Sequence, residues 1–298
     1  MLQVRQIRMR LAVLALGVGI AVLAGCGPSQ TAGQPGGAPT GAKPIMIKGS
    51  DTMVHLVTAW VDGFKKSHPG VAISVTGGGS GTGIAALLNG TTDICASSRD
   101  LSEQEKSSAG AKNLHLVEAA VARDALSIIV HPGNSIGELT MDQLRAIFTG
   151  SVANWKDVGG PDLGIVPVSR ETSSGTYMFF LEHVLKKQDF APNVLLLPAT
   201  SAITQTVADS QGAIGYVGLG YAVEAGGKVK MIGVKESPEA PAVMPSTESV
   251  LAGSYPISRP LLLVVGQEPA GTVKEFIDFC LSPEGQAIVE TSGYVKVQ

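Results

Sequence analysis

Strands and helices are expected to alternate along the first half of the globular part of this chain. Apolar runs with the length and alternation of strands lie at residues 45–47, 71–75 and 92–96. Amphipathic helices are expected from Thr52 and Thr82, and a third helix from the capping box that begins at Ser102. Such alternation places consecutive strands in parallel and packs helices against them. The pattern therefore predicts an α/β fold with a largely parallel sheet.

A second α/β pattern follows the first and predicts a two-lobed organisation. Strands at 115–121 and 125–130 complete the first pattern, and a helix follows over 140–148. The second pattern has a strand at 165–169, helices from 176 and at 202–208, and a strand at 213–217. A strand at 260–266 is expected to carry the chain back, with two helices closing the chain. We place the first crossing between lobes near residue 130. Lobe I is predicted as residues 45–129 plus 255–298 and lobe II as residues 130–254, joined by two crossing strands. A cleft between such lobes can close on a ligand.

The N-terminus has the features of an export signal that ends in a lipidation site. Arg5, Arg8 and Arg10 precede an apolar run over 11–23, and Leu23-Ala24-Gly25-Cys26 resembles a bacterial lipobox. This implies a signal peptide over 1–25, a lipid on Cys26 and a location outside the cytoplasmic membrane. An ordinary signal peptide and a signal anchor are the alternatives. Residues 26–44 are expected to form a flexible linker rich in Gly and Pro.

Charge and composition exclude several partners. The leader holds three of the 22 basic residues and no acidic one, so 19 basic residues remain against 25 acidic ones, a net charge of −6. With 5% aromatic residues and no basic run, nucleic acid is not an expected partner. About 250 residues are ample for two lobes, and we expect a monomer.

The cysteines and histidines give no sign of a metal or cofactor. Cys95 and Cys280 lie in apolar surroundings, which favours two buried free thiols over a disulfide, although export would permit one. The five histidines are scattered, without paired ligand spacing. No cofactor, metal site or catalytic residue is therefore predicted.

Three loops have the chemistry of an oxyanion site. Arg170 is followed by Ser173-Ser174-Gly175-Thr176 at the start of an expected helix. Gly49-Ser50-Asp51-Thr52 precedes another helix, and the glycine-rich stretch 77–83 joins a strand to a third. Free N–H groups at a helix start, hydroxyls and a forked guanidinium all favour a bound anion. A simple capping role remains the alternative for Ser174.

These loops, together with Ala96-Ser97-Ser98-Arg99, resemble the ligand loops of ABC-type phosphate-binding lipoproteins of the PstS family. The resemblance covers nearly all of residues 45–298 and implies the two-lobed periplasmic-binding-protein fold. It also implies inorganic phosphate as ligand and the subunits of an ABC permease as partners. The residues that it implies as phosphate ligands are Ser50, Asp51, Thr52, Ser80, Gly81, Ser97, Ser98, Arg99, Arg170, Ser173, Ser174, Gly175 and Thr176.

Two positions depart from the family pattern. Some members have an Asp where this chain has Ser98, and that carboxylate accepts the proton that phosphate keeps and sulfate lacks. Asp51 is our candidate for the replacement acceptor, with Asp100 and Glu171 as weaker ones and helix capping as the alternative role of Asp51. Thr172 stands where relatives often have an acidic residue, so the group that orients Arg170 stays open.

The sequence thus predicts an extracytoplasmic receptor that binds phosphate and delivers it to an ABC importer. A binder of sulfate or molybdate with the same fold is one alternative, and a phosphate sensor is another. A phosphatase is the third, but no nucleophile elbow or phosphate-binding P-loop is present, so we predict that the chain is not an enzyme.

Overall fold

The structure is a computed structural model that describes residues 43–297, all of which belong to one compact unit. Strands of the main sheet and of a small second sheet are β1 (Ile45–Gly49), β2 (Ile73–Thr76), β3 (Ile94–Ser97), β4 (Val117–Val130), β5 (Glu138–Thr140), β6 (Val166–Arg170), β7 (Leu195–Leu197), β8 (Ala213–Gly218), β9 (Lys230–Met231), β10 (Gly233–Lys235) and β11 (Ser258–Val265). The α-helices are α1 (Val54–Ser67), α2 (Ser80–Leu88), α3 (Glu103–Ala111), α4 (Met141–Phe148), α5 (Gly175–His183), α6 (Thr200–Asp209), α7 (Leu219–Ala225), α8 (Thr247–Leu251), α9 (Gly271–Leu281) and α10 (Pro283–Thr291). Short 3-10 turns span Asp51–Met53, Trp155–Val158 and Gly226–Lys228.

The strands pair in the order β2-β1-β3-β11-β4-β8-β6-β7, with β9 added beside β4. Pairing is parallel among β1, β2 and β3 and among β6, β7 and β8. It is antiparallel from β3 through β11 and β4 to β8. The prediction of a largely parallel sheet is thus wrong at the middle of the strand order, because two strands that cross between lobes in opposite directions must pair antiparallel.

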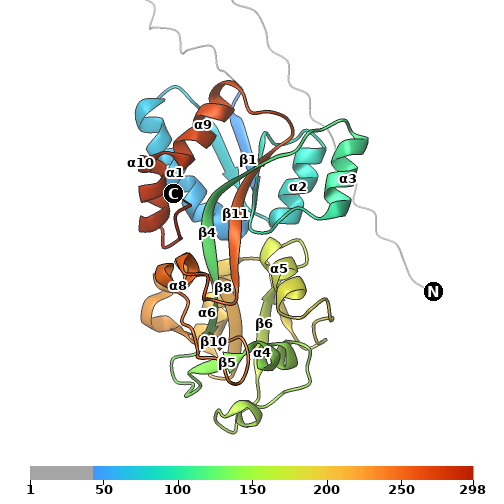
Figure 1. The fold of residues 1–298 in the computed structure, drawn as a ribbon, viewed down its shortest axis with the longest axis vertical. Coiled ribbons are helices and arrows are strands. Elements are labelled where there is room, and N and C mark those ends of the chain that lie inside the picture. The colour runs from blue at the N-terminus through green and yellow to red at the C-terminus, as the bar shows by residue number, and fades with distance from the viewer. Residues whose placement is uncertain (1–42, 298) are drawn as a thin grey trace, which may run out of the picture. The chain divides into compact units, whose positions relative to one another are not determined.

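The two crossing strands are β4 and β11, which run side by side from one lobe to the other (Figure 1). Val121 and Ala122 of β4 pack in the core of the first lobe, whereas the side chains from Ala125 onward pack with the second. The crossing therefore lies a few residues ahead of position 130.

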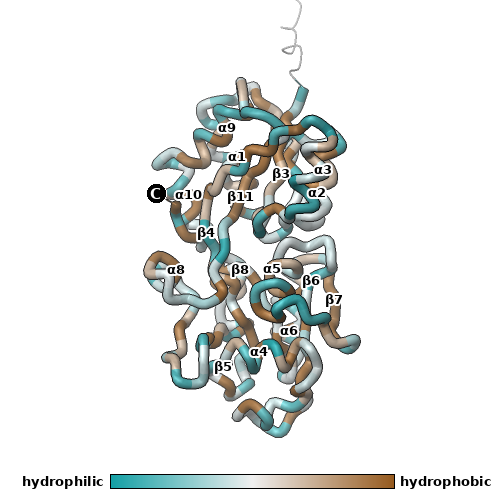
Figure 2. The backbone as a smooth tube through the Cα atoms, turned by 45° about the vertical axis from the view of Figure 1, so that its right-hand side comes forward, coloured by the Kyte–Doolittle hydropathy of each residue, from teal (hydrophilic) through white to brown (hydrophobic). Residues whose placement is uncertain are grey.

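Strand β4 is one strand of 14 residues, although the sequence predicts two. The polar pair Arg123-Asp124 gave the appearance of a break, and Figure 2 shows a hydrophilic stretch of β4 between the lobes. Arg123 keeps its main-chain hydrogen bonds with Val295, and the buried Asp124 carboxylate is fully paired. Partners on neighbouring elements thus allow the strand to continue through polar residues.

Local capping signals fix most helix starts. The predicted capping boxes at Ser102 and Thr140 are both formed, and Ser282 caps α10. Helix α2 begins at Ser80, two residues before the predicted Thr82, because Gly78 and Gly79 take positive φ angles of 111° and 98° that end the preceding loop.

Both described cysteines are buried free thiols, as the sequence favoured. They lie in different apolar clusters, and burial raises the pKa of Cys95 to about 12. Among residues 43–297, no helix is long and apolar enough to cross a membrane, and no cluster of metal-ligating side chains occurs. The predicted signal peptide, Cys26 and most of the linker lie outside the described residues.

Candidate functional site

The predicted loops of both lobes meet in the interior between the lobes. Seven hydroxyl side chains from these loops are buried. All but Ser97 form what we call the hydroxyl cluster: Ser50, Thr52, Ser80, Ser98, Ser174 and Thr176. Ser50 Oγ donates to Ser98 Oγ over 2.9 Å, and the Ser98 amide donates to Ser80 Oγ over 3.1 Å. The first-lobe hydroxyls are thus held against one another at the ends of β1 and β3 and the start of α2.

The second lobe contributes the start of α5. Thr176 Oγ1 lies 2.9 Å from Thr52 Oγ1, which joins the two lobes directly. Ser174 caps α5, because its side chain accepts hydrogen bonds from the Thr176 and Tyr177 amides. Capping and membership of the cluster are therefore compatible roles for Ser174.

Arg170 lies at the end of β6 with only 2% of its surface exposed. Its guanidinium donates to the main-chain oxygens of Leu197 and Pro198, to Thr200 Oγ1 and to Asp51 Oδ2. Burial lowers the pKa of Arg170, while Asp51 opposes that shift. Asp51 thus occupies the orienting position that the sequence left open, and it does so from the opposite lobe.

A second buried arginine was missed by the sequence analysis. Arg259 on β11 donates from Nε and Nη2 to Asp124 Oδ2 on β4, over 3.0 and 2.8 Å. Its Nη1 donates to Thr176 Oγ1 over 2.9 Å, and the Leu219 amide donates to Asp124 Oδ1. Burial raises the pKa of Asp124, and Arg259 opposes the shift. The available signal in the sequence was a charged residue of each sign, Asp124 and Arg259, next to the mostly apolar runs 125–130 and 260–265.

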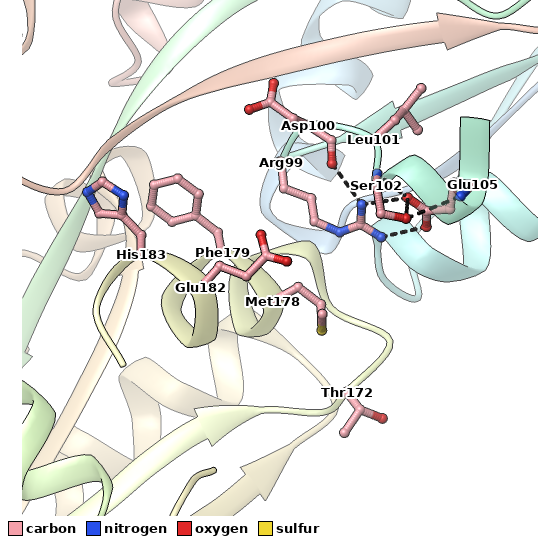
Figure 3. Close-up of a pocket in the computed structure, with 10 residues that line it drawn as sticks. All are labelled: Arg99, Asp100, Leu101, Ser102, Glu105, Thr172, Met178, Phe179, Glu182 and His183. Atoms are coloured by element: carbon pink, nitrogen blue, oxygen red, sulfur yellow. Dashed lines mark hydrogen bonds and ion pairs between the residues drawn. The ribbon is translucent and has the colours of Figure 1, made fainter. Parts of the chain in front are cut away.

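Three predicted site residues point elsewhere. Arg99 forks onto Glu105 of α3 over 2.9 and 2.7 Å, and Ser97 Oγ donates to the main-chain oxygen of Arg99. Arg99 lines a cavity of about 420 Å³. In Figure 3 it lies across from Phe179 and Glu182 of α5. The structure therefore does not bring the side chains of Ser97 and Arg99 into the hydroxyl cluster. Ser173 donates from its hydroxyl to the Gly78 oxygen.

The glycine loop is built for close approach between the lobes. The Gly81 amide donates to the main-chain oxygen of Ser173 over 3.0 Å, and a Cβ at Gly79 would lie 2.4 Å from that same oxygen. Glycine at these positions lets the backbone of one lobe touch the backbone of the other.

Gly175→Ala is expected to weaken ligand binding about 10- to 100-fold by obstructing closure. A Cβ at Gly175 would lie 2.2 Å from Ser80 Oγ and 2.9 Å from Ser98 Oγ, in the opposite lobe. Alanine itself suits a helix start in an open form, so the unliganded chain should unfold at an unchanged temperature. Gly110→Ala in α3, where nothing lies within 4 Å, is the matched control. Titration with phosphate measures the affinity of both variants, and thermal melts measure their unfolding temperatures. Unchanged binding by Gly175→Ala would contradict the close approach of the two lobes at this position.

Two lobes joined by two strands, with hydroxyls of both gathered at the junction, define a solute-binding protein of the periplasmic-binding-protein type. The profile of the PBP superfamily domain matches residues 30–284. The chain belongs to this superfamily and, within it, to the PstS family of phosphate-binding proteins.

Individual relatives are similar to this chain over most of its length. The phosphate-binding protein PstS of Pseudomonas aeruginosa is 35% identical over 266 residues, which cover 84% of this chain and 81% of the relative. PstS of Bacillus subtilis is 33% identical over 254 residues, covering 85% and 80%. A phosphate ABC transporter substrate-binding protein of Clostridium perfringens, solved with bound phosphate, is 35% identical and has a TM-score of 0.77, covering 86% of this chain and 100% of its own.

Proposed function

We propose that this protein is an extracytoplasmic receptor that binds inorganic phosphate and delivers it to an ABC-type importer. The observation that carries the proposal is the hydroxyl cluster. Hydroxyls from loops of both lobes are buried together, next to Asp51 and its partner Arg170. Many neutral donors plus a cation can replace the hydration shell of a small anion without a large charge cluster.

The names of relatives support the same function. Curated relatives are called phosphate-binding proteins, and the similar structure from Clostridium perfringens contains phosphate. We further propose that the ligands are the cluster hydroxyls, Gly175 and Arg170, and that the chain is a monomer and not an enzyme. The Ser173 hydroxyl and the Gly81 amide instead donate to main-chain oxygens of each other's loops. The lobes that close on the ligand are residues 45–129 plus 255–298 and residues 130–254, within a few residues at the crossing.

We also propose that a lipid on Cys26 holds the protein at the outer face of the membrane. The lipobox and the positively charged leader support this placement. Cys26→Ala should move the protein from the membrane fraction to the soluble extracytoplasmic fraction, and retention in the membrane would contradict the anchor.

Calorimetric titration of the full chain in detergent tests the function. The protein is first freed of bound anion, and phosphate, sulfate and molybdate are then titrated separately at pH 7. Tight binding of one phosphate per chain, with no binding of the other two, is the expected result. A preference for sulfate or molybdate would keep the fold and overturn the ligand, and no binding of any anion would overturn the receptor role.

A further inference from the structure

Asp51 belongs to the first lobe, but the groups that bind it come from the second. Its Oδ2 accepts from Arg170 Nη1 over 3.2 Å and from the Thr200 amide over 2.7 Å. Its main-chain oxygen accepts from the Tyr221 hydroxyl over 3.1 Å. Donors from β6, α6 and α7 therefore converge on one residue of the opposite lobe.

The Thr200 contact gives α6 its N-terminal cap. Ala199 stands at the N-cap position and has no side chain that can cap, so the first turn of α6 lacks a cap from its own segment. The Asp51 carboxylate supplies the missing acceptor from across the cleft. A negative charge at this end of a helix is also favoured by the helix dipole.

The same segment surrounds Arg170. The main-chain oxygens of Leu197 and Pro198 and the hydroxyl of Thr200 accept from the guanidinium on one side, and Asp51 Oδ2 accepts on the other. Asp51 thus bonds both to the guanidinium and to the segment that cradles it. Without Asp51, the Arg170 charge would be 98% buried with only neutral acceptors.

We propose that Asp51 is a positioning residue: when the lobes close, its carboxylate caps α6 and fixes the guanidinium of Arg170 for the ligand. This inference rests on the proposed function. Asp51 Oδ2 has two donors from the second lobe, and the charge of the carboxylate is matched by Arg170, which favours action through Arg170 over acceptance of a proton from phosphate. This proposal gives Asp51 an orienting role in place of the proton-accepting role expected from the sequence.

The first test compares phosphate release from the full chain in detergent. Asp51→Ala is expected to raise the dissociation rate about 10- to 100-fold, because a contact to a charged group is lost only in the closed form. Asp51→Asn keeps an oxygen for the Thr200 amide and should lose less. Asp62→Ala, which removes an exposed carboxylate from α1 of the same lobe, is the control and should leave release unchanged.

A double-mutant cycle separates positioning from direct contact with the ligand. If Asp51 acts through Arg170, adding Asp51→Ala to Arg170→Lys should weaken phosphate binding by no more than about threefold beyond Arg170→Lys alone. If the two losses multiply, Asp51 contacts the ligand independently and the proposal is overturned.

A distance measurement reports closure itself. Spin labels at Ser107→Cys and Gln188→Cys lie on exposed positions of opposite lobes, while Cys95 and Cys280 are buried. With saturating phosphate, Asp51→Ala should retain a population at the longer, open distance, and a distribution identical to that of the unsubstituted chain overturns the proposal. If the unsubstituted chain binds no phosphate, the proposed function fails. The unliganded distances then decide: a shift to longer distances in Asp51→Ala supports positioning, and no shift overturns it.

Discussion

Arg170→Ala is expected to weaken phosphate binding by roughly 2 to 5 kcal/mol, a loss of about 30- to 5,000-fold. Arg170 is buried and forms part of the proposed site, so its removal takes away a buried cation and leaves Asp51 without its charged partner. Much of the loss is the cost of groups left unpaired, not the net worth of one contact. Calorimetric titration with phosphate measures it.

Two further variants define what Arg170 contributes. Arg170→Lys keeps a charge but lacks the planar fork that serves Asp51, Pro198 and Thr200 together, so it should recover only part of the affinity. Arg123→Ala removes an exposed arginine of β4 and controls for the change in net charge. If Arg170→Ala loses less than tenfold, Arg170 does not belong to the site.

Local signals in the sequence predicted much of the fold and of the candidate site. Capping boxes at Ser102 and Thr140 fix helix starts through bonds to the next few residues, so the sequence alone contains the whole interaction. The three hydroxyl-bearing loops were likewise predicted from their position at helix starts, and in the structure Ser50 and Ser80 both contact Ser98 while Thr176 contacts Thr52.

What the sequence could not predict depends on partners far along the chain. Asp51 contacts Arg170, 119 positions away, and Asp124 contacts Arg259, 135 positions away. Arg99 differs from these two cases, because its guanidinium pairs with Glu105, only six positions away. The burial and pairing of Asp51, Arg170, Asp124 and Arg259 depend on how distant segments pack together, which no local sequence pattern indicates.

Breaking the ion pair between Asp124 and Arg259 is expected to cost about 3 to 5 kcal/mol of unfolding free energy. Both side chains have no exposed surface, and they join the two crossing strands. Arg259→Met leaves the Asp124 carboxylate buried without its cation, and a buried unpaired charge is strongly destabilising. Urea unfolding without bound anion measures the change.

A second substitution distinguishes lost pairing from lost packing. Adding Asp124→Asn to Arg259→Met removes the unpaired charge but keeps an oxygen for the Leu219 amide, so it should restore much of the stability. Lys274→Met breaks an exposed pair with Asp278 and should cost less than about 1 kcal/mol. If Arg259→Met costs no more than this control, the pair does not hold the crossing strands together.

The same substitution should reach the ligand through Thr176. Arg259 donates to Thr176 Oγ1, so the hydroxyl has its own proton free to donate toward Thr52 or an anion. In the doubly substituted chain, where the fold is largely restored, phosphate affinity should therefore remain below that of the unsubstituted chain. Affinity that returns fully with stability would show that Arg259 supports the fold alone.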